Sequence, residues 1–187
     1  MLMEKIETDI DLGTARWQAR VDLAAAHRLA GMHGFHEGIF NHLTLRVPGS
    51  NDRYYQIPFG LHWSEVTASC FMEVGYDGPA FDPAEGERLS QAIGDKTVLM
   101  MANHGVATVG ATCAEAYDRL YYVERVAQVQ LYAMWTGKPL KHLPQKVVEQ
   151  SIKEFQGGRN YGGKKPAIWH FEALKRILDR KEPDYKN

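Results

Sequence analysis

The sequence predicts an α/β protein, a mixed α/β sandwich in which helices cover a mainly antiparallel sheet. Predicted strands and helices alternate along the chain, which favours a sheet covered by helices. An early pair of strands is joined by a short turn, which makes that pair antiparallel. The 187 residues can bury one core. We expect residues 1–140 to form the main domain and residues 141–187 to form a C-terminal helical extension.

The first half of the chain contains a predicted helix, a hairpin and a short strand. Residues 14–30 place one apolar face at helical spacing and are followed by glycines. Residues 43–47 alternate apolar and polar side chains, the pattern of a half-buried strand. The turn-forming residues Pro48–Asp52 then lead into a returning strand at 53–57. A third short strand is predicted at 71–74.

Helices dominate the second half. Asp82 is a predicted N-cap for a helix from Pro83 to Ile93. Strands at 97–102 and 106–109 are followed by a long helix that starts near Thr112. Its predicted apolar stripe, at spacings of three and four, is formed by Ala116, Leu120, Val123, Ala127, Leu131 and Met134. Two further helices are predicted at 145–155 and 167–180.

Composition excludes several classes of protein. The formal net charge is -1, which gives no electrostatic reason to expect nucleic acid or a membrane surface as a partner. Cys70 and Cys113 form no CxxC motif, so we expect a reducing, cytoplasmic setting. The acidic N-terminus lacks the apolar region of a signal peptide. No run approaches the roughly 18 apolar residues that a membrane span requires.

The segment Asn103-His104-Gly105 is the first candidate for chemistry. It joins the two strands at 97–102 and 106–109, and a histidine at a glycine-flanked bend can direct its imidazole into a pocket. Such a residue is a candidate metal ligand or acid/base. The alternative is that the imidazole only hydrogen-bonds nearby backbone. Two other motifs fail: His36-Glu37 has Phe40 where HExxH needs histidine, and Lys165 replaces Ser/Thr after Gly158–Lys164.

Three stretches together resemble the class II aldolase/adducin family, with the adducin-like branch closer than the sugar-phosphate aldolases. They are LAAAHRLAGMHGFHEGIFNHLTLRVPG, IPFGLHWSEVTAS and GDKTVLMMANHGVATVGATCAEAYDRLYYVERVAQVQLYA, and they cover most of residues 20–137. The resemblance implies an α/β/α fold and a divalent metal, usually zinc, held by three histidines. The family contains lyases, epimerases and decarboxylases of small hydroxy- or oxo-compounds.

The resemblance also assigns residues. His104 corresponds to the third histidine ligand. Asn41 and His42 match the segment that lines the anion end of the substrate pocket in the aldolases. The alternative for Asn41 and His42 is that their side chains hold a bend by hydrogen bonds. A metal in such a site would polarise the carbonyl and enediolate oxygens of the substrate.

The chain departs from the family pattern at its centre. Several dozen residues that relatives carry between the segments near Val74 and Tyr76 are missing, and no His-x-His occurs in the sequence. Those residues would supply two ligands and the catalytic carboxylate, so His104 is expected to be a single remnant ligand and no catalytic residue is assigned. A rebuilt zinc site remains open as an alternative, with candidate ligands at His33, His36, His42 and His62.

Three functions therefore remain open. The chain is a metal-dependent enzyme with impaired catalysis, a non-catalytic assembly protein of the adducin type, or an internally deleted variant with no role of its own. The tyrosines of the long helix favour a subunit interface, and strands that lose neighbours expose edges. We therefore expect a homo-oligomer with a small hydroxy- or oxo-compound as its substrate if it is active.

Overall fold

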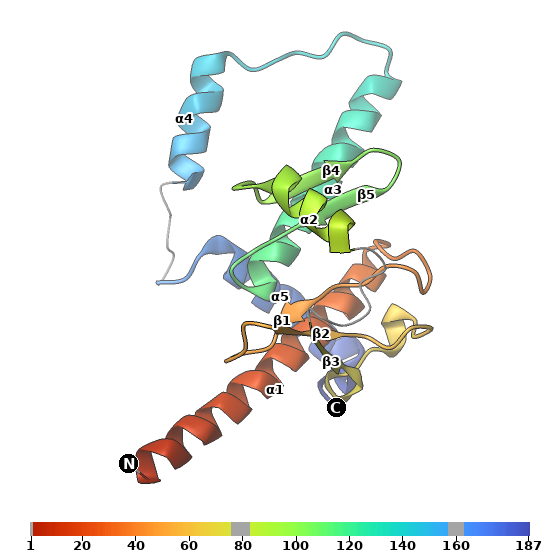
Figure 1. The fold of residues 1–187 in the computed structure, drawn as a ribbon. Helices are drawn as coiled ribbons and strands as arrows, with labels where there is room; N and C mark the ends of the chain where they lie inside the picture. The colour runs from red at the N-terminus through yellow and green to blue at the C-terminus, as the bar shows by residue number, and fades with distance from the viewer. Residues whose placement is uncertain (1, 76–82, 157–162) are drawn as a thin grey trace. The chain divides into compact units, whose positions relative to one another are not determined.

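The computed structural model describes residues 2–75, 83–156 and 163–187 of the chain (Figure 1). These residues form two compact units. The first unit comprises Met1–Asp95 with Leu174–Asn187, and the second comprises Lys96–Ala173. The strands form two separate antiparallel sheets among the described residues, one in each unit. The mainly antiparallel character predicted from the sequence is confirmed.

Helix α1, Leu2–Met32, is the central element of the first unit and is longer than the predicted 14–30. Its last third is buried, and small alanines let neighbouring elements approach the helix axis closely. The buried apolar residues of this helix are Val21, Leu23, Ala24, Ala25, Ala26, Leu29 and Ala30. Gly34, at φ +76°, ends the helix, with hydrogen bonds from Gly34 N to Gly31 O and from Phe35 N to Ala30 O. This is the Schellman arrangement, and it confirms the predicted glycine stop.

A three-stranded sheet in the order β1-β2-β3 belongs to the same unit. Strand β1 is Leu45–Arg46, β2 is Arg53–Gln56 and β3 is Met72–Gly75. The predicted hairpin is present, although β1 is shorter than the predicted 43–47. The predicted alternation also holds, since Val47 is buried whereas the side chains at 42, 44 and 46 are exposed.

Three short 3-10 helices pack against α1: η1 (Trp63–Glu65), η2 (Ala68–Cys70) and η3 (Pro183–Lys186). They contribute large buried side chains, among them Trp63 and Tyr185. Helix α2, Pro83–Ile93, has the bounds predicted from the sequence. Its proposed N-cap Asp82 lies outside the described residues.

The second unit is built on a hairpin and a long helix. Strand β4 is Val98–Met101, β5 is Gly105–Thr108, and β5 packs against α3, Cys113–Trp135. The Thr112 side chain accepts from Glu115 N at 3.2 Å, which confirms the predicted cap. Gly110 passes so close to this first turn that a Cβ there would lie 2.5 Å from Ala116 N. Only glycine fits at that position.

The apolar stripe predicted for α3 is buried less than expected. Its first members are half-buried, but Leu131 and Met134 are exposed. The periodicity therefore predicted the helix correctly, but the predicted burial of its last turns was wrong. Helix α4 is Gln145–Gln156 and α5 is Pro166–Lys181, both close to the predicted ranges. No described helix combines the length and the apolarity that a membrane crossing requires.

Candidate functional site

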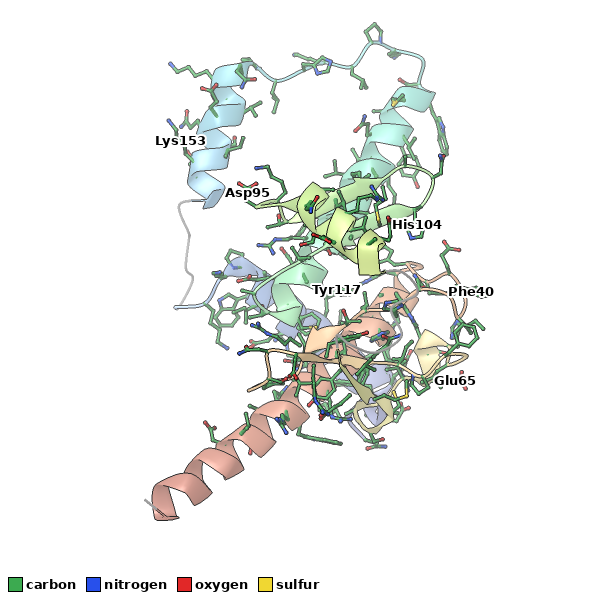
Figure 2. The ribbon with its side chains drawn as sticks, viewed as in Figure 1. Phe40, Glu65, Asp95, His104, Tyr117 and Lys153 are labelled. Atoms are coloured by element: carbon green, nitrogen blue, oxygen red, sulfur yellow. The ribbon has the colours of Figure 1, made fainter. Side chains whose placement is uncertain are left out.

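His104 lies in the tight loop that joins β4 to β5 (Figure 2). Met101 pairs with Gly105, and His104 N donates to Met101 O at 3.3 Å. Asn103 has φ +57° and Gly105 has φ +138°, so the loop uses two left-handed conformations. The His104 side chain is exposed to solvent. The two predicted strands therefore pair as a hairpin that presents this imidazole at its tip.

Asn41 holds a bend. Its Nδ2 donates to Phe35 O at 3.1 Å and its Oδ1 accepts from Glu37 N at 3.0 Å. Its backbone oxygen accepts from Trp63 Nε1 at 3.1 Å. His42 is exposed. Asn41 and His42 belong to the first compact unit and His104 to the second.

His27 is a buried histidine that the sequence analysis did not single out. Its Nδ1–H donates to Leu23 O at 2.8 Å and its Nε2 accepts from Leu43 N at 3.2 Å. Burial, together with the nearby charge of His42, lowers its pKa from 6.5 to about 4, although the Leu23 carbonyl opposes the shift. A neutral imidazole thus ties α1 to the segment that leads into β1. In the sequence, the position of His27 among the apolar residues of the predicted helix could have indicated that it is buried.

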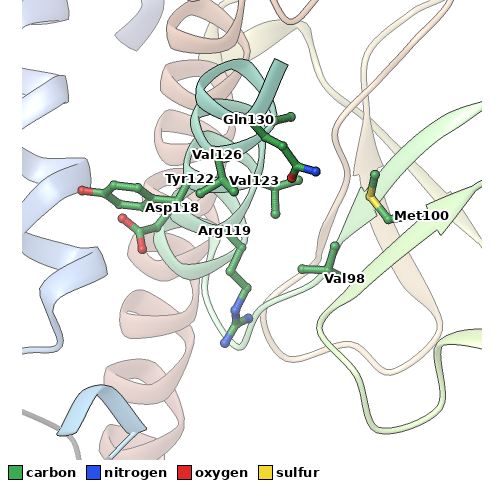
Figure 3. A pocket seen from close by; sticks show the side chains of 9 residues that line it. Val98, Met100, Asp118, Arg119, Tyr122, Val123, Val126 and Gln130 are labelled. Carbon is green, nitrogen blue, oxygen red and sulfur yellow. The ribbon is translucent and has the colours of Figure 1, made fainter. Parts of the chain in front are cut away.

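A groove of about 520 Å³ lies between α3 and β4 within the second unit (Figure 3). Its lining is mainly apolar, and its polar members are Asp118, Arg119, Tyr122 and Gln130. Asp118 Oδ1 lies 2.7 Å from Nδ1 of His170, whose ring contacts those of Tyr121 and Tyr122. No local sequence pattern marks this pair, because 52 positions separate its members.

Of the four histidines that were predicted as alternative metal ligands, the structure brings two, His36 and His62, into contact. The rings of His36 and His62 are in edge contact, whereas His33 packs against Phe35. Within residues 2–75, 83–156 and 163–187, no three side chains of His, Cys, Asp or Glu are close enough to hold one ion. The donors described around His104 therefore do not fit the three-histidine centre that the family resemblance implies. The predicted junction at Tyr76–Pro79 lies outside the described residues.

Comparison with known proteins identifies the fold and the family. The family model "Class II Aldolase and Adducin N-terminal domain" matches residues 21–86 and 79–131. The match comes in two pieces that overlap at residues 79–86. A putative aldolase class 2 protein of Caulobacter vibrioides is 26% identical over 241 aligned positions, covering 91% of this chain and 93% of the relative. Since 241 exceeds the 187 residues of this chain, part of that relative has no counterpart here.

Some of the other similar proteins are named as adducin-related and others as aldolases. An adducin-related protein of Schizosaccharomyces pombe is 20% identical and covers 89% of this chain and 76% of its own length. A crystal structure of an aldolase II superfamily protein from Pseudomonas syringae matches with a TM-score of 0.81 at 24% identity, over 92% of this chain and 96% of the other. L-fuculose 1-phosphate aldolase from Glaciozyma antarctica matches with a TM-score of 0.76 at 20% identity, over 94% of each chain.

Proposed function

Because this chain belongs to the class II aldolase and adducin family, we propose that it is a member with impaired metal-dependent lyase activity. The observation that supports the proposal is that His104, the residue that corresponds to the third histidine ligand of the family, has too few other metal-binding side chains around it in the described structure. His104 is exposed at a hairpin tip, and no group of three donors occurs in the described part of the chain. Catalytic zinc sites use about three protein ligands and keep one position open. A single exposed imidazole competes poorly with water for such an ion.

In the family a divalent metal, usually zinc, polarises the substrate carbonyl. We propose that a small hydroxy- or oxo-compound would contact the segment of Asn41 and His42, which matches the substrate-binding segment of the aldolases. Both amide atoms of Asn41 are already engaged by backbone groups at 3.0 and 3.1 Å. These two hydrogen bonds fix the orientation of the side chain at the bend, while one N–H and one lone pair of the amide are not used by them. This supports a positioning role for Asn41 and leaves the exposed His42 as the proposed contact to an anionic substrate.

The test is a carbon–carbon cleavage assay. The purified chain, loaded with Zn²⁺, is incubated with L-fuculose 1-phosphate, and aldehyde release is measured beside a full-length family aldolase. We expect no cleavage above background, and no difference between the wild type and His104→Ala. Zinc-dependent cleavage that disappears in His104→Ala would overturn the proposal.

A second candidate is assembly through α3, and the exposure of its C-terminal half favours it. Val126, Val129 and Trp135 are 62%, 61% and 76% exposed. Leu131, Tyr132 and Met134 are also exposed, although the exposed Arg125 and Gln130 interrupt the apolar surface. Large exposed apolar patches on soluble proteins mark surfaces that bind another protein. We propose a second copy of this chain as the partner, which makes the protein a homo-oligomer.

Two further assignments belong to the proposal. Residues 1–140 are proposed as the family domain and 141–187 as an extension that folds back, supported by the contacts of Arg28 with Glu182 and Asp184. A reducing, cytoplasmic location is proposed because the two cysteines, Cys70 and Cys113, form no CxxC motif.

A further inference from the structure

His36 and His62 lie side by side in the first unit, although 26 positions separate them in the sequence. His36 follows the end of α1, and His62 is the N-cap of η1. Their ring centroids are 4.8 Å apart with an interplanar angle of 78°. Both side chains are half-buried, so the pair is in contact with solvent.

One nitrogen of this pair lacks a protein partner. Nδ1 of His36 is buried, and no described residue hydrogen-bonds to it. Buried polar atoms in proteins are nearly always hydrogen-bonded, and a bound ion is one of the few explanations for an exception. The atom therefore calls for a ligand that the surrounding protein does not supply.

The ring of His62 is held in a fixed orientation. Its Nδ1 accepts from Ser64 N at 3.2 Å and lies 2.7 Å from Ser64 Oγ, while its backbone N donates to Glu65 Oε2 at 3.1 Å. Metal binding at Nε2 requires the other tautomer, in which Nδ1–H donates to Ser64 Oγ and the hydrogen bond from Ser64 N is given up. Histidines that bind metals usually donate their other ring N–H in this way, which orients the ligating nitrogen.

We propose that His36 and His62 form a two-imidazole site for a divalent transition-metal ion, with water in the remaining positions. Imidazole nitrogens suit Zn²⁺, Ni²⁺ and Cu²⁺, and among these Cu²⁺ binds most tightly. Zinc–nitrogen bonds of about 2.0–2.1 Å place two tetrahedral ligands about 3.3 Å apart, so binding requires one nitrogen of each ring to approach the other to that distance. With two protein ligands the ion is held weakly and exchanges with solvent.

This site is distinct from the remnant of the family centre. It uses neither His104 nor the segment that relatives carry and this chain lacks. Its existence does not depend on whether the chain cleaves any substrate. We expect His36 and His62 to hold one divalent cation that exchanges with ions in solution.

The test uses the full chain without a histidine tag. Zn²⁺ and Cu²⁺ are titrated by calorimetry into the wild type, His36→Ala, His62→Ala and the double variant, with His42→Ala and His104→Ala as matched controls. We expect one equivalent of metal, a dissociation constant raised about tenfold or more in each single variant, and no change in the controls. Electron paramagnetic resonance of the Cu²⁺ complex should show two coordinated nitrogens in the wild type and one in each single variant.

A second readout is independent of calorimetry. Zn²⁺ should raise the melting temperature of the wild type, because a ligand that binds only the folded state stabilises it, and should leave that of the double variant unchanged. Should His62→Ala lose the η1 cap and unfold, His36→Ala carries the test, because no hydrogen bond to a described residue is lost there. Unaltered affinity in His36→Ala, or equal effects of His36→Ala and His104→Ala, would refute the site.

Discussion

Nη2 of Arg28, on α1, donates to Oδ2 of Asp184 at 2.7 Å across 156 positions of sequence. The same guanidinium donates from Nη1 to Glu182 at 3.0 Å and from Nε to Val66 O at 2.8 Å. Arg28 is buried, whereas the side chain of Asp184 is 55% exposed. One side chain thus joins α1, the segment after η1 and the C-terminal turn.

Arg28→Ala should destabilise the chain by about 2–3 kcal/mol, because it leaves the buried Val66 carbonyl without its donor and removes both ion pairs. Asp184→Ala should cost less than about 1 kcal/mol, since that carboxylate is mostly solvated. Urea unfolding followed by circular dichroism measures both. Arg88→Ala, which breaks an exposed pair with Glu85, is the matched control and should have almost no effect. Equal losses in Arg28→Ala and Arg88→Ala would contradict this account.

Gly110→Ala should destabilise the second unit. The added Cβ would lie 2.5 Å from Ala116 N and 2.9 Å from Glu115 Cβ, so the start of α3 must shift. We expect a loss of about 1–3 kcal/mol, the cost of overpacking. Gly86→Ala is the control: it lies in α2 with nothing within 4 Å of a Cβ, and should stabilise by up to about 1 kcal/mol. Thermal melts that rank the two variants the other way would refute the close approach at Gly110.

His27 should make the chain sensitive to acid. Its folded pKa of about 4 lies below the ordinary 6.5, so the unfolded chain takes up the proton first as the pH falls. Protonation of His27 should leave the free energy of unfolding unchanged above pH 6.5. Between pH 6.5 and 4 it should lower the free energy of unfolding by up to about 3 kcal/mol. Urea midpoints across this range measure the decline. His27→Gln should flatten it, whereas His104→Ala should leave it unchanged.

The exposed half of α3 should drive self-association. Val126→Glu with Val129→Glu places two charges on an apolar face and should convert the oligomer to a monomer. Light scattering coupled to size-exclusion chromatography gives the mass, and Asn51→Asp adds a charge at an exposed turn as the control. We also expect lower thermal stability than in a full-length relative. A wild-type monomer that melts as high as such a relative would disprove the assembly proposal.

Local patterns predicted most of the elements. The alternation in 43–47 and the turn residues Pro48–Asp52 yielded the first hairpin, and Thr112 with Glu115 marked the start of α3. These signals involve neighbours in sequence, so periodicity and capping rules can detect them.

Contacts between distant segments were not predictable in this way. The pairing of Arg28 with the C-terminal turn, of Asp118 with His170 and of His36 with His62 depends on how whole elements pack. Asn41 illustrates the limit at a single residue: the resemblance pointed to a substrate contact, while an alternative drawn from turn chemistry pointed to a bend. Its side-chain hydrogen bonds fit the second interpretation.

The edge contact between Trp63 and His27 provides an optical probe of acid titration. The ring centroids are 5.2 Å apart, and the indole is almost fully shielded from water. Protonation of the imidazole places a cation beside this chromophore and should quench its emission, while Trp135, which is largely solvated, would respond instead to soluble quenchers such as acrylamide. Intrinsic fluorescence can therefore follow the core of the first unit without any attached dye.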